Sequence, residues 1–132
     1  MKLVILFISL LSISFAQKYA LLHYSIEEGL AQSTVYHLNI DKQGFLWCSS
    51  QDGISRFDGI YFENYSTKEG LQNERVLTTF QDKFNDIWVG TLSNGIYKVH
   101  KDSVFSFSYN HTLPNNNIND ILFFQENYWF AT

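Results

Sequence analysis

The chain repeats itself with a period of 41 residues, and few folds are compatible with such a repeat. Trp47, Trp88 and Trp129 follow one another at this spacing. The same spacing relates several other pairs, which are Tyr24 and Tyr65, Gly29 and Gly70, Leu30 and Leu71, Val35 and Val76, and Asp41 and Asp82. Gly53 and Gly95 correspond with one inserted residue. Because tryptophan is a rare residue, we infer that one structural unit is used more than once.

Each unit is predicted to contain four short strands separated by turns. In the first unit the strands are expected at 35–40, 45–49, 54–57 and 61–65, and in the second at 76–81, 87–91, 96–99 and 104–107. Asp58-Gly59 is typical of a tight hairpin turn. The corresponding turn at 101–103 is expected to be longer.

A repeated unit of four antiparallel strands predicts an all-β fold made of β-propeller blades. The repeats are placed at about 24–64, 65–106 and 107–132, and the third is partial. A propeller usually has about 4–8 blades, so we expect an incomplete propeller that stops within a strand pair. Residues 19–24 are predicted to form an extra strand that completes the last blade of the ring.

The first 16 residues have the pattern of a signal peptide, with cleavage expected after Ala16. The alternative is a membrane anchor, but the apolar run is shorter than the roughly 20 residues that span a bilayer. Cys48 is the single cysteine, so no internal disulfide can form, and we expect a buried structural thiol. The net charge of −4, with no cluster of basic residues, argues against binding of nucleic acid.

The motifs of the repeat resemble the two-component regulator propeller repeat over residues 19–132. The first copy shows Gly29-Leu30, Val35, Asp41, Gly44, Phe45-Leu46-Trp47, Asp52-Gly53, Arg56-Phe57-Asp58-Gly59 and Phe62. The second shows Asp82, Ile87-Trp88-Val89-Gly90-Thr91 and Gly95-Ile96-Tyr97. The chain departs from the pattern at Ser49-Ser50 and at Ala131, which stand where the second copy has Gly-Thr and Gly.

The resemblance implies the exported sensor region of a Bacteroidetes-type two-component regulator. In such proteins two seven-bladed propellers commonly precede a β-sandwich domain, a membrane helix and a cytoplasmic histidine kinase, to which hybrid forms add a receiver and a DNA-binding domain. It further implies a full-length protein that is membrane-anchored and dimeric, with a periplasmic ectodomain that senses polysaccharide fragments.

The recurring residues are interpreted first as structural. Trp47, Trp88 and Trp129 are expected to fill the space between adjacent sheets, although an aromatic ring at a propeller mouth could also stack on a sugar. The turn aspartates are expected to bind nearby backbone amides, and they are Asp41, Asp52, Asp58 and Asp82. The four histidines, at positions 23, 37, 100 and 111, match no metal-binding spacing. Asn115-Asn116-Asn117 could contact a ligand, but a simple polar loop is the preferred interpretation.

No catalytic residue, metal site or cofactor is predicted from the sequence, and the ligand-binding residues are not identified. The leading hypothesis is a sensor that binds an oligosaccharide and signals to a downstream kinase. Two alternatives stay open. One is an exported propeller enzyme such as a polysaccharide lyase or hydrolase, and the other is a secreted adhesion or scaffold module. A membrane helix and a kinase domain encoded downstream would separate the first hypothesis from both alternatives.

Overall fold

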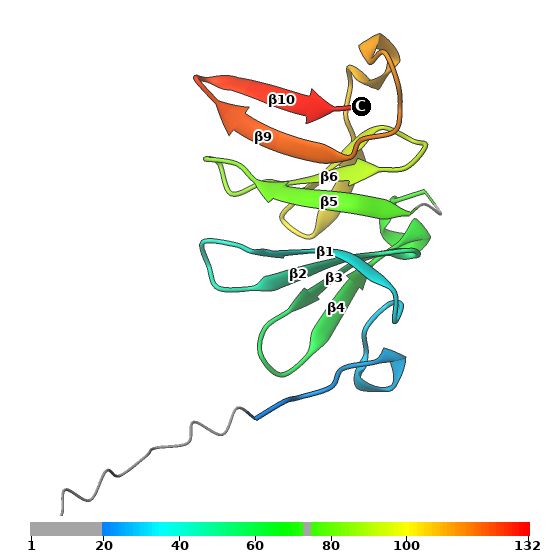
Figure 1. The fold of residues 1–132 in the computed structure, drawn as a ribbon, viewed down its shortest axis with the longest axis vertical. Coiled ribbons are helices and arrows are strands. Elements are labelled where there is room, and N and C mark those ends of the chain that lie inside the picture. The colour runs from blue at the N-terminus through cyan, green and yellow to red at the C-terminus, as the bar shows by residue number, and fades with distance from the viewer. Residues whose placement is uncertain (1–19, 73–74) are drawn as a thin grey trace, which may run out of the picture.

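The computed structural model describes residues 20–72 and 75–132, which form three antiparallel sheets stacked side by side (Figure 1). The first sheet contains β1 (Val35–Ile40), β2 (Leu46–Ser50), β3 (Gly53–Phe57) and β4 (Phe62–Tyr65). The second contains β5 (Val76–Gln81), β6 (Ile87–Thr91), β7 (Ile96–His100) and β8 (Ser103–Ser106). The third pairs β9 (Asp120–Phe124) with β10 (Asn127–Ala131). This confirms the all-β prediction and the four-stranded blade.

The repeated sequence around Tyr-Ser before each sheet forms a short 3-10 helix. These helices are η1 (Ile26–Glu28) and η2 (Thr67–Glu69), and a third, η3 (Asn110–Thr112), precedes β9. Ser25 with Glu28, and Ser66 with Glu69, close a capping box in which each side chain bonds the other residue's backbone N–H. Gly29 and Gly70 then adopt positive φ angles of 105° and 102°, which end both helices in the same way. In the described part of the chain the helices are far too short to cross a bilayer.

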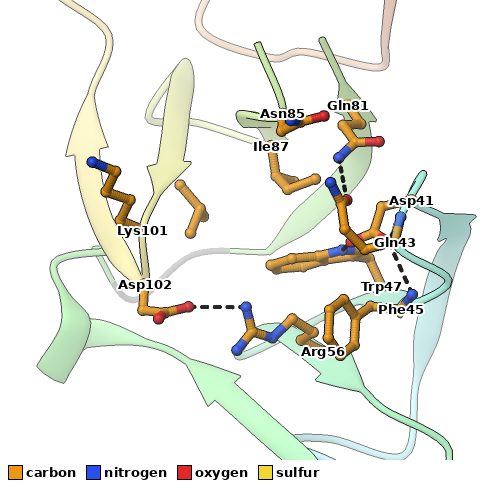
Figure 2. Close-up of a pocket in the computed structure, with 11 residues that line it drawn as sticks. Asp41, Gln43, Phe45, Trp47, Arg56, Gln81, Asn85, Ile87, Lys101 and Asp102 are labelled. Carbon is orange, nitrogen blue, oxygen red and sulfur yellow. Dashed lines mark hydrogen bonds and ion pairs between the residues drawn. The ribbon is translucent and has the colours of Figure 1, made fainter. Parts of the chain in front are cut away.

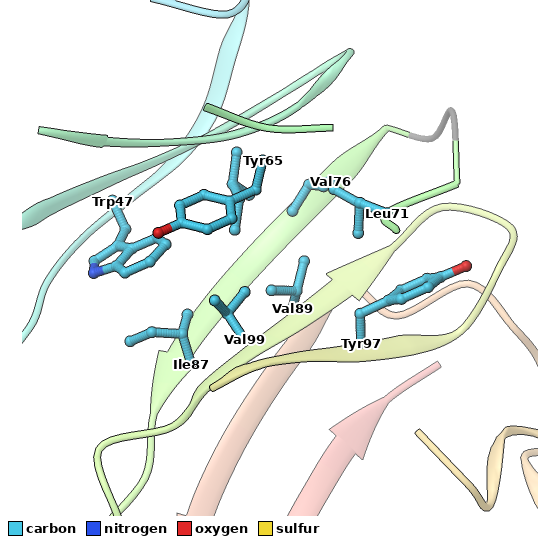
Figure 3. Close-up of a cluster of buried hydrophobic side chains, with 9 residues drawn as sticks. Trp47, Tyr65, Leu71, Val76, Ile87, Val89, Tyr97 and Val99 are labelled. Carbon is cyan, nitrogen blue, oxygen red and sulfur yellow. The ribbon is translucent and has the colours of Figure 1, made fainter. Parts of the chain in front are cut away.

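Two apolar cores hold the sheets together. The first lies between the first two sheets and contains Trp47, Ile54, Tyr65, Leu71, Val76, Ile87, Val89, Tyr97 and Val99 (Figure 3). The second lies between the second and third sheets, around Trp88, Ile96, Ile118 and Ile121. Strand β1 contacts β5, and β5 contacts β9. The leading strands of the three sheets therefore lie side by side, as they do around the axis of a propeller.

Two turns differ from the sequence expectation. The turn after β3 spans residues 58–61, because the Asp58 carboxylate accepts the backbone N–H groups of Ile60 and Tyr61 and widens it. The turn after β7 needs only Lys101 and Asp102, both with positive φ, the pattern of a two-residue type I′ hairpin. The expectation that the 101–103 turn is the longer one was therefore wrong.

Two further expectations concern the open faces of the stack, where the described residues supply no neighbouring sheet. The described part of the predicted strand at 19–24 is not a strand, because no neighbouring strand lies beside residues 20–24 to share hydrogen bonds. Trp129 is 58% exposed, and it occupies the position at which Trp47 and Trp88 pack against the following sheet. It stands on the face of the third sheet that no other described sheet covers. The predicted signal peptide, residues 1–16, lies outside the described residues.

Candidate ligand groove between the first two blades

In each of the first two sheets, an aspartate at the turn after the first strand makes the same set of hydrogen bonds. In the first sheet, Asp41 Oδ1 accepts the backbone N–H groups of Gln43 and Phe45, both at 2.9 Å. Its Oδ2 accepts the Trp47 indole N–H at 2.8 Å. A single buried carboxylate therefore fixes the turn and also sets the position of the ring that fills the core.

The second sheet repeats this arrangement and adds one contact. Asp82 accepts the backbone N–H groups of Phe84 and Asp86 and the indole N–H of Trp88 at 2.8 Å. The Tyr128 hydroxyl of the third sheet also donates to Asp82, at 3.1 Å. Burial and this negative neighbour raise the pKa of Tyr128 to about 12. The turn aspartate thus joins two sheets as well as shaping one turn.

A polar groove opens between the first two sheets beside these turns (Figure 2). Its cavity of about 150 Å³ has a buried apolar floor made of Trp47, Ile87 and Val99. Polar side chains form the walls, namely Gln43 and Arg56 from the first sheet and Gln81, Asn85, Lys101 and Asp102 from the second. Both blades are therefore needed to form the groove.

Arg56 crosses the groove and binds both sheets. Its guanidinium pairs with Glu63 on the neighbouring strand β4 and with Asp102 of the second sheet at 2.9 Å. The same group lies over the Phe45 ring, 5.0 Å from the centroid (Figure 2). Burial alone would lower the pKa of Arg56, but Tyr65 and the two carboxylates raise it above its ordinary value. The charge of Arg56 is therefore already compensated within the protein.

Amide side chains link the two turns on the other wall. Gln81 Nε2 donates to Gln43 Oε1 at 2.8 Å, and Gln81 Oε1 accepts the backbone N–H of Lys42 at 2.7 Å. The Lys42 ammonium donates to the Asp82 carbonyl at 3.1 Å. These bonds hold the two turns in one relative position, so the groove is preformed.

A second cavity, of about 370 Å³, shares Phe45 and Arg56 with the first. It extends along the outer strands to Asp58, Tyr61 and Glu63. Tyr61, at the margin of this cavity, is 73% exposed. We call these two adjacent cavities together the turn-face groove. An exposed ring beside convergent polar groups is the composition of a site for a polar organic ligand.

Several residues singled out in the sequence lie at the other end of the sheets. Gly53 and Gly95 begin or precede the third strand of each blade, where φ is 124° and 72°. A β-carbon on Gly53 would lie 2.3 Å from the Tyr65 carbonyl oxygen, so only glycine fits there. Asn116 belongs to the same end, since its carbonyl accepts the Gly95 N–H at 2.9 Å. The Asn115–Asn117 loop is thus held against the second blade and takes no part in the groove.

The histidines and the cysteine also lie outside the groove. His37 Nδ1 accepts the Thr79 backbone N–H at 3.4 Å, and His100 pairs with Asp86. Within the described ranges no three His, Cys, Asp or Glu side chains gather closely enough to hold a metal ion. Cys48 is buried, and burial raises the pKa of its thiol.

Sequence reasoning missed most of the groove. Its polar walls come from Gln43, Arg56, Gln81, Asn85 and Asp102, none of which was a candidate. Arg56 and Asp102 are 46 positions apart and so do not share the 41-residue period. Their pairing follows from the way one blade leans on the next. The repeat period gives each blade, but contacts between blades would have to be sought at longer spacings.

Comparisons with known proteins agree with this architecture. Residues 70–93 match the family described as two component regulator propeller. The fold is similar to the extracellular domain ascribed to the hybrid two component system BT3049 from B. thetaiotaomicron, with a TM-score of 0.71 and 25% identity. That match covers 84% of this chain and 17% of that chain, so the chain spans about a sixth of the length of its structural relative. No curated protein gave a significant match.

The matched segment contains the parts of the blade on which the architecture depends. It starts at Gly70, which ends η2, and it includes Asp82 and Trp88 together with strands β5 and β6. The first sheet carries the same aspartate–tryptophan device, and the structural match extends over most of the chain. The chain therefore contains a segment that matches the two component regulator propeller family, and its fold is similar to that of a solved extracellular domain over most of its length.

Proposed function

We propose that the chain is part of the periplasmic ligand-sensing propeller of a two-component regulator, which binds glycan fragments and signals to a histidine kinase. The observation that carries this proposal is the structural similarity to the extracellular domain of a hybrid two-component system over 84% of the chain. The family match to the two component regulator propeller supports it. The predicted signal peptide is consistent with export.

The turn-face groove gives the proposal a physical basis. The groove lies between two blades, and Arg56 with Asp102 joins them across it. A ligand held there contacts both blades at once. It would therefore favour whichever relative orientation of the blades gives it the better contacts. Such a bias is what a sensor must pass to its output domain.

The test uses the full-length protein in membrane vesicles, with a panel of glycan fragments added to the extracellular side. We expect one class of fragment to change the rate of autophosphorylation and to bind with a measurable Kd. The Asp102→Ala variant should weaken the response, because it removes the ion pair with Arg56 that joins the two blades across the groove. A protein that binds no glycan, or that binds one without any change in phosphorylation, would contradict the proposal.

A further inference from the structure

We propose that the turn-face groove selects uncharged sugar chains over acidic ones, with the Tyr61 ring as its stacking platform. This inference rests on the proposed function, because it assumes that the ligand is a glycan. It adds the charge class of that glycan and the residues that impose it.

The first argument is the charge of the lining. Four carboxylates line the groove, which are Asp41, Asp58, Glu63 and Asp102. Only two cations, Arg56 and Lys101, line it as well. The groove is therefore negative overall, and an incoming carboxylate or sulfate group would be repelled.

The second argument is that Arg56 is already occupied. One terminal nitrogen of its guanidinium binds Glu63 and the other binds Asp102. An acidic sugar could reach Arg56 only by displacing one of these carboxylates. The exchange would replace one ion pair by another and leave the displaced carboxylate beside the ligand's own negative charge. Arg56 thus organises the groove without offering a free site for an anion.

The third argument is that the remaining groups suit hydroxyls. A sugar hydroxyl both donates and accepts, and the amide groups of Gln43, Gln81 and Asn85 can serve either role. The carboxylates of Glu63 and Asp102 retain acceptor positions for further hydroxyls. Tyr61 presents an exposed ring at the edge of the groove, against which the C–H face of a sugar can lie. Neutral, hydroxyl-rich chains therefore match both the charge and the donors of this site.

The experiment measures binding to the full-length protein by isothermal titration calorimetry. The probes are oligogalacturonate trimers in the free acid form, the same trimers fully methyl-esterified, and neutral trimers of galactose, glucose, xylose and arabinose. We expect at least one uncharged trimer to bind, and we expect the free acid to bind at least about tenfold more weakly than any uncharged trimer that binds.

Variants of groove residues test whether the trimers bind in the turn-face groove. Tyr61→Ala should weaken binding of the neutral trimer about tenfold or more, whereas Tyr109→Ala, which alters an exposed ring outside the groove, should not. In Glu63→Gln, the difference in Kd between the free acid and the neutral trimer should become smaller, because the variant removes one negative charge from the wall of the groove. Circular dichroism of each variant shows whether its fold is retained.

The outcomes separate this inference from the proposed function. Binding of the acid as tight as that of the neutral trimers would overturn the selectivity and leave glycan sensing intact. Neutral binding that is unchanged in a folded Tyr61→Ala variant would place the ligand elsewhere and overturn the site. Failure of every trimer to bind would remove the proposed function and this inference with it.

Discussion

The two contacts between sheets differ in how completely they are closed. Between the first and second sheets, Trp47 and Tyr65 of the first sheet share a core with Val89 and Val99 of the second. Arg56 also reaches across to Asp102. Between the second and third sheets, Trp88 packs on Phe107 and Tyr128, but Lys98, which occupies the place of Arg56, pairs with Asp86 of its own sheet at 2.5 Å.

This difference follows from how much of each neighbouring blade the described residues contain. The first contact has four strands on each side, and β7–β8 supplies Asp102. The second contact has only β9 and β10 on one side. Trp88 is buried at the second contact by the two strands β9 and β10 of the third sheet together with residues of its own sheet. Among the described residues, the ion pair across the sheets and the turn-face groove lie at the contact where both blades have four strands.

The largest predicted effect concerns the uncovered faces at the two ends of the stack. Leu38 and Ile40 on the first sheet, and Leu122, Phe124 and Trp129 on the third, are all more than half exposed. Residues 17–132 expressed alone should therefore associate, because apolar sheet faces and open strand edges bind one another. Size-exclusion chromatography with light scattering measures this. A monodisperse monomer with a sharp thermal transition would show that the exposed faces are tolerated.

The next prediction compares the two core tryptophans. Trp47→Ala and Trp88→Ala in the full-length protein should each cost about 3–5 kcal/mol of local stability, the range for removing a buried aromatic ring. The two losses should be similar, because the side chains are 2% and 5% exposed and each donates its indole N–H to a turn aspartate. Hydrogen exchange of the amides of β2 and β6 measures both values. A loss below about 1 kcal/mol in either variant would mean that its ring does not hold its blade to the next.

Much of this comparison could be predicted from the sequence. The bounds of β1, β5 and β6 agree with the alternation of apolar residues and the turn signals, because both are local. The repeat also pointed to the aspartates and tryptophans. The turn at 58–61 was misjudged because Asp-Gly favours a two-residue hairpin, whereas the Asp58 side chain here binds two backbone N–H groups.

What could not be predicted depends on contacts between blades. The pairing of Arg56 with Asp102 requires the angle between two sheets. For the same reason the groove, which both blades line, was not recognised as a site.

A smaller difference is expected between the two turn aspartates. Asp82→Ala should cost about 3 kcal/mol and Asp41→Ala about 2 kcal/mol, because each leaves buried N–H groups without an acceptor. Asp82 also loses the Tyr128 hydroxyl, a contact with the third sheet that Asp41 does not make. Urea titration of the full-length protein, followed by circular dichroism, compares the variants. Asp52→Ala, at an exposed turn position, serves as the control and should change stability by less than about 0.5 kcal/mol.

The smallest predicted effect is a pH dependence confined to the second contact. Burial acts to raise the pKa of Asp86, but hydrogen bonds and charges from Lys98 and His100 outweigh it and lower the pKa below its ordinary value. A carboxylate with a lowered pKa stabilises the fold above its unfolded pKa of about 3.9, and this contribution is lost as the pH falls further. Because the pair is partly exposed, the loss should stay below about 1 kcal/mol. Urea midpoints at pH 5 and pH 3 should therefore differ less in Asp86→Asn than in the unaltered protein, while Asp52→Asn should leave the difference unchanged. If the difference in urea midpoint between pH 5 and pH 3 is the same in both variants, the Lys98–Asp86 pair does not stabilise this part of the fold.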